Sequence, residues 1–340
     1  MAINKYMRAA LKALSYGEPD LTGNYEMVRK IKELKRGVGA GLAYRTWDHL
    51  VPCGDHHVPV RIFVPDAGPL GRPVLLFFHG GGWVTGNIEN YSGVCAALAK
   101  ATGCLVASVD YRLAPEHKFP SGLNDCYAAA QELLEKPGLL GVERDQITLI
   151  GDSAGGNLAA AVSLMARDRG GFLPTRQILI YPAVYSDHTP ASPFPSVQEN
   201  GTDYLLTSKR VEEYLQLYRS KPEDLQNPYL APLLAGDFSG QPDTLVITAE
   251  YDPLRDEGEA YGEKLREFGN DVEIHRIHDA LHGFMSLSPG FKPVKRTYRY
   301  INDFLSGRSD SFGQVLASVA DQEDEPEETV IMDKEVNELE

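Results

Sequence analysis

A serine flanked by glycines is the clearest sign of chemistry in this chain. Ser153 lies in the sequence Gly-Asp-Ser-Ala-Gly, with Gly151 two residues before it and Gly155 two residues after it. An apolar run precedes this sequence and an alanine-rich segment follows it, as expected for a strand that turns directly into a helix. Such a tight turn leaves little room for side chains two positions from the serine, so glycine is favoured at both. The spacing predicts that Ser153 is a nucleophile exposed at the end of a strand.

A second glycine cluster could stabilise the negative charge that such a nucleophile creates. The stretch 79–83 reads His-Gly-Gly-Gly-Trp and follows another apolar run. Attack on a carbonyl carbon leaves negative charge on its oxygen, which backbone N–H groups stabilise where no side chain blocks the approach. We predict that the amides of Gly81, Gly82 and Ala154 form this oxyanion hole.

A serine nucleophile also needs a base and a carboxylate that orients the base. Asp252 is the best-placed carboxylate, because it ends an apolar run and Pro253 follows it. Glu250, Asp256 and Glu257 compete with Asp252, although the last two suit the first turn of the following helix.

The predicted base is His282, which precedes Gly283 in a loop late in the chain. His278 is its main competitor, His275 lies within a predicted strand, and His188 precedes the strand of Asp252. The resulting order Ser, Asp, His differs from that of trypsin-like proteases, in which the serine comes last.

Other side chains near these motifs are assigned supporting roles. His79 is interpreted as a brace that hydrogen-bonds to the backbone of the glycine loop, rather than as a base. Trp83, Tyr185 and Tyr204 are predicted to line the substrate pocket, although ordinary core packing would explain them equally well.

The elements around these residues predict an α/β fold. Apolar runs alternate with helical segments from residue 73 to 305, which favours a mostly parallel sheet with helices on both faces. The segments 40–52 and 56–65 read as an antiparallel pair of strands ahead of it. The residues 183–235 interrupt the alternation.

These features predict a catalytic domain with a cap and a tail. The catalytic domain spans 46–308, and its insertion 183–235 is expected to form a helical cap together with helices in 1–45. The segment 309–340 is acidic and predicted to be disordered. It could bind an unidentified partner.

Four motifs in this order resemble the hormone-sensitive-lipase-like esterases. They are His-Gly-Gly-Gly at 79–82, Gly-Asp-Ser-Ala-Gly-Gly at 151–156, Asp-Pro-Leu-Arg-Asp-Glu at 252–257 and His-Gly-Phe at 282–284, and the stretch 110–120 is also similar. The resemblance implies an α/β-hydrolase fold with an eight-stranded, mostly parallel sheet and a helical cap. It also implies hydrolysis of short-to-medium acyl esters by Ser153, His282 and Asp252, without metal or cofactor.

Two other functions use the same scaffold. Hydrolysis of amides or peptides would need the same three residues. A non-catalytic small-molecule receptor, such as the plant gibberellin receptors, lacks the catalytic histidine, whereas this chain retains His282.

Composition limits the partners and the compartment. The net charge is −15, of which the segment from Asp310 onward contributes −10, so the remaining body is only mildly acidic and nucleic-acid binding is not expected. No apolar run is long enough to span a membrane.

Four cysteines without a C-x-x-C pair predict a reducing, cytoplasmic environment. The edge strand near 271–277 could pair with a second copy to form a homodimer.

Overall fold

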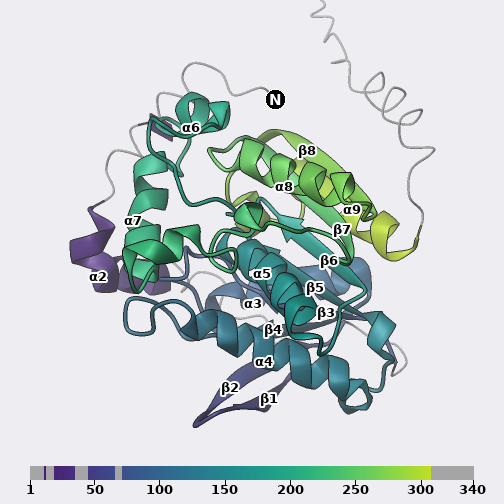
Figure 1. Cartoon of the computed structure of the whole chain (residues 1–340). Coiled ribbons are helices and arrows are strands. Elements are labelled where there is room, and N and C mark those ends of the chain that lie inside the picture. The colour runs from purple at the N-terminus through teal and green to yellow at the C-terminus, as the bar shows by residue number, and fades with distance from the viewer. Residues whose placement is uncertain (1–10, 13–18, 35–44, 66–70, 308–340) are drawn as a thin grey trace, which may run out of the picture. The chain divides into compact units, whose positions relative to one another are not determined.

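The computed structural model describes residues 11–12, 19–34, 45–65 and 71–307, which include an eight-stranded sheet (Figure 1). The strand order is β1-β2-β4-β3-β5-β6-β7-β8. The strands are β1 (Thr46–Cys53), β2 (His56–Phe63), β3 (Val74–Phe78), β4 (Leu105–Val109), β5 (Ile147–Asp152), β6 (Arg176–Ile180), β7 (Asp243–Tyr251) and β8 (Val272–Leu281). β2 pairs antiparallel with β1 and β4, and every other pairing is parallel. The predicted α/β fold with a mostly parallel sheet is confirmed.

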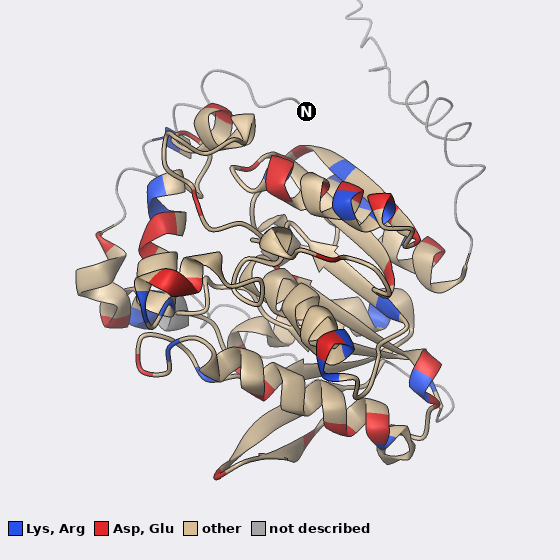
Figure 2. Ribbon diagram, viewed as in Figure 1, with Lys and Arg blue, Asp and Glu red and all other residues tan. Residues whose placement is uncertain are grey.

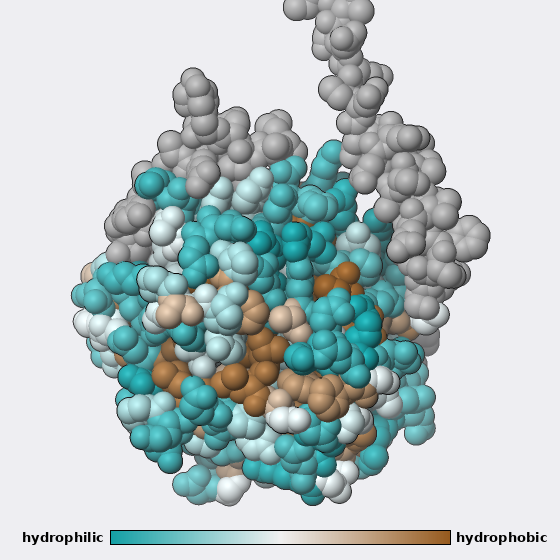
Figure 3. Space-filling model, turned by 45° about the horizontal axis from the view of Figure 1, so that its top comes forward, coloured by the Kyte–Doolittle hydropathy of each residue, from teal (hydrophilic) through white to brown (hydrophobic). Residues whose placement is uncertain are grey.

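The central strands are apolar on both faces because helices cover both faces of the sheet. All five residues of β3 and all five of β4 are buried, which explains their continuous apolar sequences. Figure 2 shows the charged residues mainly on helices and loops, while the central strands are almost free of charge. Figure 3 shows a face on which hydrophobic residues gather in a band across the middle.

Helices follow the strands as the sequence predicted. They are α2 (Leu21–Leu34), α3 (Ile88–Thr102), α4 (Ser121–Glu135), α5 (Ala154–Arg169), α6 (Pro195–Asn200), α7 (Ser208–Tyr218), α8 (Arg255–Glu267) and α9 (Lys292–Leu305), with short 3-10 turns at Pro137–Leu140, Arg144–Gln146, Pro222–Gln226, Pro232–Leu234 and Phe284–Ser286. α4, α5 and α8 cover one face of the sheet and α3 the other. Asn302 of α9 donates to the carbonyl of Ala101 at the end of α3 (3.1 Å).

The interval 183–235 holds α6 and α7, and α7 packs against α2. Arg210 of α7 donates to the carbonyl of Pro19 (2.7 Å), and the amide of Leu21 donates to Glu213 (3.3 Å). These hydrogen bonds therefore connect the segment around α2 with α7, although the two lie far apart in the sequence. Most of the segment 1–45, for which cap helices were predicted, lies outside the described residues. The whole of the predicted tail 309–340 also lies outside them.

No helix in the described part of the chain has both the length and the apolar character needed to cross a membrane.

The turn from β5 into α5 is packed tightly against the end of β3. A Cβ atom added to Gly155 would collide with the backbone carbonyl of Phe78 and come within 2.8 Å of the carbonyl carbon of His79. Backbone atoms on both sides are held by the sheet and the helix, so neither can move away cheaply.

We therefore expect Gly155→Ala to lower the free energy of unfolding by about 3 kcal/mol or more, measured by urea denaturation. Gly138→Ala is the matched control, because a Cβ at this exposed position meets no atom within 4 Å. The control should change stability by no more than about 0.5 kcal/mol. Equal stability of the two variants would contradict the packing described here.

Candidate active site

Ser153 occupies the tight turn between β5 and α5. Its backbone has φ 56° and ψ −120°, a strained conformation for a residue other than glycine. The amide of Ser153 donates to the carbonyl of Ile180 on β6 (2.9 Å), and its carbonyl accepts from Asn157 of α5 (3.0 Å). These bonds hold the turn so that the side chain points out of the sheet into a pocket.

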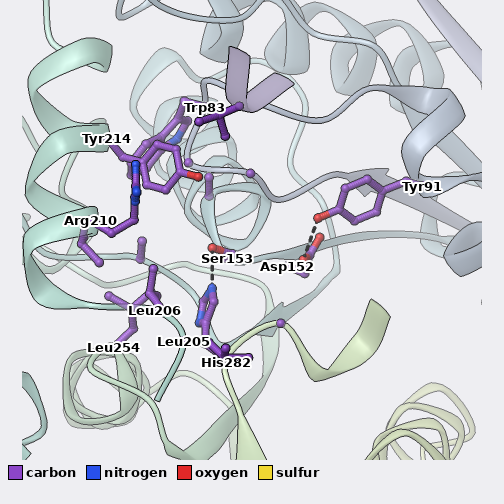
Figure 4. Close-up of a pocket in the computed structure, with 17 residues that line it drawn as sticks. Trp83, Tyr91, Asp152, Ser153, Leu205, Leu206, Arg210, Tyr214, Leu254 and His282 are labelled. Carbon is purple, nitrogen blue, oxygen red and sulfur yellow. Dashed lines mark hydrogen bonds between the residues drawn. The ribbon is translucent and has the colours of Figure 1, made fainter. Parts of the chain in front are cut away.

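The structure brings Ser153, His282 and Asp252 into one chain of hydrogen bonds. His282 Nε2 lies 2.9 Å from Ser153 Oγ, and its Nδ1 lies 2.7 Å from Asp252 Oδ2. Figure 4 shows the imidazole facing the serine across the first of these bonds. With Nδ1 donating to the carboxylate, Nε2 is left to accept the serine proton. The three residues come from the ends of β5, β7 and β8.

Asp252 is fully buried at the end of β7. Its second oxygen accepts from the amide of Leu254 (2.9 Å), and Asn200 of α6 donates to its carbonyl (3.2 Å). A buried carboxylate is stable only when its oxygens are hydrogen-bonded in this way. The carboxylate is therefore fixed beside the imidazole.

The competing carboxylates have other partners. Glu250 accepts from the amide of Asp279 (2.7 Å), Asp256 from that of Ser196 (2.7 Å), and buried Glu257 contacts His188 (2.6 Å). The structure does not bring them to Ser153.

The competing histidines also lie elsewhere. His275 stacks on Tyr300, with ring centroids 3.9 Å apart, and the side chain of His278 is 71% exposed beside Glu250. The ring of His188 is buried against Glu257.

The three residues predicted to provide the oxyanion hole line the pocket next to Ser153. Gly81 and Gly82 both have positive φ, and the carbonyl of Gly81 accepts from the amides of Val84 (3.2 Å) and Thr85 (2.9 Å), which closes the glycine loop into a turn. Ala154 is the first residue of α5, so its N–H lacks a partner within the helix. Gly81, Gly82 and Ala154 line the pocket together with Ser153, an arrangement that can stabilise an oxyanion.

His79 lies beneath this loop and away from Ser153. Its ring is buried, stacks on Tyr111 with centroids 4.3 Å apart, and hydrogen-bonds through Nδ1 to the carbonyl of Gly80 (2.8 Å). Burial lowers the pKa of His79 to about 4. The ring is therefore neutral at neutral pH and holds the loop by hydrogen bonding.

Asp152 joins the glycine loop to the serine turn, and the sequence reasoning missed it. One carboxylate oxygen accepts from the amide of Gly80 (2.8 Å), and the other accepts from the hydroxyls of Tyr91 (3.1 Å) and Tyr181 (3.5 Å). Burial raises the pKa of Asp152 to about 6, against the hydrogen bonds that favour its charged form. Its position directly before Ser153 was the available signal.

Ser153 opens into a mostly apolar pocket of about 260 Å³. Its walls include Val28 of α2, Trp83, Leu205, Leu206, Val211 and Tyr214 of α7, and Leu254, with Arg210 as a charged neighbour. Figure 4 shows Trp83 and Tyr214 together on the side of the pocket away from His282.

The structure does not bring Tyr185 or Tyr204 to this pocket, which corrects their predicted position. The ring of Tyr185 packs edge-on against Phe194 (5.2 Å between centroids), and the buried ring of Tyr204 stacks on Tyr251 (4.9 Å). Trp83 does line the pocket, and its ring stacks on Tyr218 (4.6 Å).

Comparisons with known proteins agree with this architecture. Residues 75–286 match a family described by the alpha/beta hydrolase fold. An arylesterase of Saccharolobus solfataricus is 38% identical over 262 residues, which cover 76% of this chain and 84% of the relative. The carboxylesterase NlhH of Mycobacterium tuberculosis is 36% identical over 234 residues, covering 68% of this chain and 72% of the relative.

Solved structures give the same result. A hyperthermophilic esterase from the archaeon Pyrobaculum calidifontis superposes with a TM-score of 0.81 at 36% identity, covering 91% of this chain and 99% of the other. The chain belongs to the α/β-hydrolase fold family, and its resemblance to the hormone-sensitive-lipase-like esterases is confirmed.

Proposed function

We propose that the protein is a carboxylic ester hydrolase that cleaves short-to-medium acyl esters through Ser153, His282 and Asp252. The observation that carries the proposal is the chain of hydrogen bonds of 2.9 Å and 2.7 Å through His282, which ends at a serine facing a pocket. The relatives named arylesterase and carboxylesterase support the ester as substrate.

In the first half of the reaction, His282 Nε2 takes the proton of Ser153 as Oγ attacks the ester carbonyl carbon. Asp252 stabilises the resulting imidazolium through Nδ1. The tetrahedral intermediate collapses, the carbon–oxygen bond to the alcohol breaks, and His282 gives its proton to the leaving alkoxide. In the second half, water repeats these steps on the acyl-enzyme and releases the acid.

The negative oxygen of both intermediates binds the amides of Gly81, Gly82 and Ala154. Such preorganised donors typically contribute 10²–10³ each in rate. His79 and Asp152 are positioning residues in this scheme, because their hydrogen bonds to Gly80 hold the glycine loop.

The walls of the pocket are consistent with short-to-medium acyl chains. The ring of Tyr214 lies so close to Gly82 that an added Cβ there would collide with it. Because Trp83 and Tyr214 lie together on the side of the pocket away from His282 (Figure 4), we propose that Tyr214 limits the length of the acyl chain.

We also propose that α2 and the insertion 183–235 form a cap on the catalytic domain 46–308. The contacts between α2 and α7, and the pocket walls that both provide, support this organisation. The acidic segment 309–340 is proposed to be a separate tail that could bind a partner.

We propose that the protein resides in the reducing cytoplasm and that it forms a homodimer. All four cysteines are free thiols, and three of them are buried. β8 ends the sheet, so its outer edge is a candidate for pairing with a second copy. Nucleic acid, metal and cofactor have no part in the proposed reaction.

Replacing the nucleophile tests this function. We expect Ser153→Ala to lower kcat for p-nitrophenyl butyrate by roughly 10⁵–10⁶-fold, with an unchanged circular dichroism spectrum. Ser239→Ala, which removes an exposed serine hydroxyl, should keep full activity. Substantial hydrolysis by the folded Ser153→Ala variant would exclude this mechanism.

The buried carboxyl of Asp152 should make stability depend on pH. Since its pKa is about 6 in the folded protein and 3.8 is its ordinary value, the folded state binds the extra proton between these limits. We therefore compare the free energy of unfolding of the wild type with that of Asp152→Asn. The difference, wild type minus variant, should fall by on the order of 2 kcal/mol from pH 4 to pH 6 and stay level above pH 7. A difference that rises over this window would contradict the raised pKa.

Shortening the tyrosine in the pocket should change substrate preference. Tyr214→Ala is expected to raise the ratio of kcat/KM for the octanoate over the butyrate p-nitrophenyl ester by roughly 10-fold or more, since each methylene group that gains a contact is worth about 1–3 kcal/mol. Tyr185→Ala is the matched control, because this tyrosine packs on Phe194 outside the pocket. If both variants changed the ratio of kcat/KM to the same extent, Tyr214 would not be the residue that selects the length of the acyl chain.

A further inference from the structure

The tip of the hairpin formed by β1 and β2 carries a cysteine and a histidine side by side. Cys53 and His56 are directly paired across the two strands, and the two-residue turn between them contains Gly54 at φ 60°. Residues paired in this way project from the same face of the hairpin. Their partly buried side chains therefore lie together, whereas His57 is exposed and belongs to the alternate face.

Helix α4 adds a buried carboxylate to this pair. Asp125 Oδ1 lies 2.9 Å from His56 Nε2 and 3.8 Å from Cys53 Sγ, and the Asp125 side chain is only 1% exposed. All three potential ligand atoms lie within 4.8 Å of one another, and no other such group of three occurs among the residues that the structure describes. None of the three residues lines the pocket of Ser153.

We propose that Cys53, His56 and Asp125 form a binding site for Zn²⁺, with water as the fourth ligand. Sulfur, imidazole nitrogen and carboxylate oxygen are the three donor types that zinc accepts in tetrahedral sites, and a thiolate selects zinc over Mg²⁺ or Ca²⁺. The separations of 2.9 Å between His56 Nε2 and Asp125 Oδ1 and of 3.8 Å between Cys53 Sγ and Asp125 Oδ1 are close to those of ligand atoms that lie about 2.0–2.3 Å from one zinc ion. Binding displaces the thiol proton of Cys53 and the proton between His56 Nε2 and Asp125 Oδ1, and both protons are released to water.

Neighbouring charged groups shape this site. Asp55 Oδ1 lies 3.3 Å from His56 Nδ1, where a carboxylate commonly orients a metal-bound histidine. The Arg112 guanidinium contacts both oxygens of Asp125, at 2.9 Å from Nε and 2.8 Å from a terminal nitrogen, and its backbone amide donates to Oδ2 (2.9 Å). These bonds fix Asp125 in place, while the positive charge opposes a cation and weakens its binding.

Cobalt(II) titration of the untagged, metal-free full chain tests the site, because a cobalt–thiolate bond produces a charge-transfer band in the near ultraviolet. We expect this band to saturate at one equivalent and to disappear when Zn²⁺ is added. Cys53→Ser should abolish it, and Asp55→Asn should weaken cobalt affinity by roughly 10-fold. His57→Ala is the matched control and should titrate as the wild type does.

A thermal measurement gives an independent readout. Zn²⁺ should raise the Tm of the wild type and of His57→Ala, but not that of Cys53→Ser, because a ligand stabilises only a folded state that binds it. The circular dichroism spectrum without metal establishes that each variant is folded. No saturable cobalt binding, or a charge-transfer band that persists in folded Cys53→Ser, would overturn the proposal.

Discussion

The close packing of the turn at Ser153 against the end of β3 is the constraint on which the site depends. Gly155 approaches the backbone of Phe78 so nearly that no side chain fits between them. This contact keeps the first turn of α5 beside the loop that follows β3, so the amides of both segments border one pocket. The positive φ of Ser153 is the local strain that accompanies this placement, and the surrounding buried sheet stabilises it.

Two buried carboxylates complete the arrangement on either side of the serine. Asp252 hydrogen-bonds to His282, and Asp152 hydrogen-bonds to the amide of Gly80. A buried charge is costly unless its hydrogen bonds are made, so each carboxylate holds its partner in a narrow range of positions. One of them orients the proposed base, and the other holds the loop of proposed oxyanion donors. These hydrogen bonds arrange the site before substrate arrives, as electrostatic catalysis requires.

The sequence predicted those parts of the site that depend on local motifs and strand order. Ser153, Asp252 and His282 each follow a strand, and parallel strands end at a common edge, so their meeting could be expected. Contacts between side chains that lie far apart in the sequence could not be predicted in this way, because no local motif marks them. Tyr204 was expected in the pocket but stacks on Tyr251.

Other contacts were hidden for the same reason. The position of Asp152 directly before Ser153 was a local sign of a role in the site, but it did not identify the glycine loop as the partner of its carboxylate. The hairpin residues Cys53 and His56 meet Asp125 only because α4 packs beneath them. Such pairings depend on how the helices pack on the sheet. Neither the spacing of residues in the sequence nor the composition predicts this packing.

The most direct test of the central claim is covalent labelling by a fluorophosphonate, followed by mass spectrometry of the peptides. A serine activated by its neighbours attacks phosphorus and keeps the adduct, whereas an ordinary hydroxyl does not react. We expect one adduct per chain, on Ser153, with loss of ester hydrolysis in proportion to labelling. An adduct on another residue, or full hydrolysis by a chain labelled at Ser153, would contradict the role of Ser153 as the nucleophile.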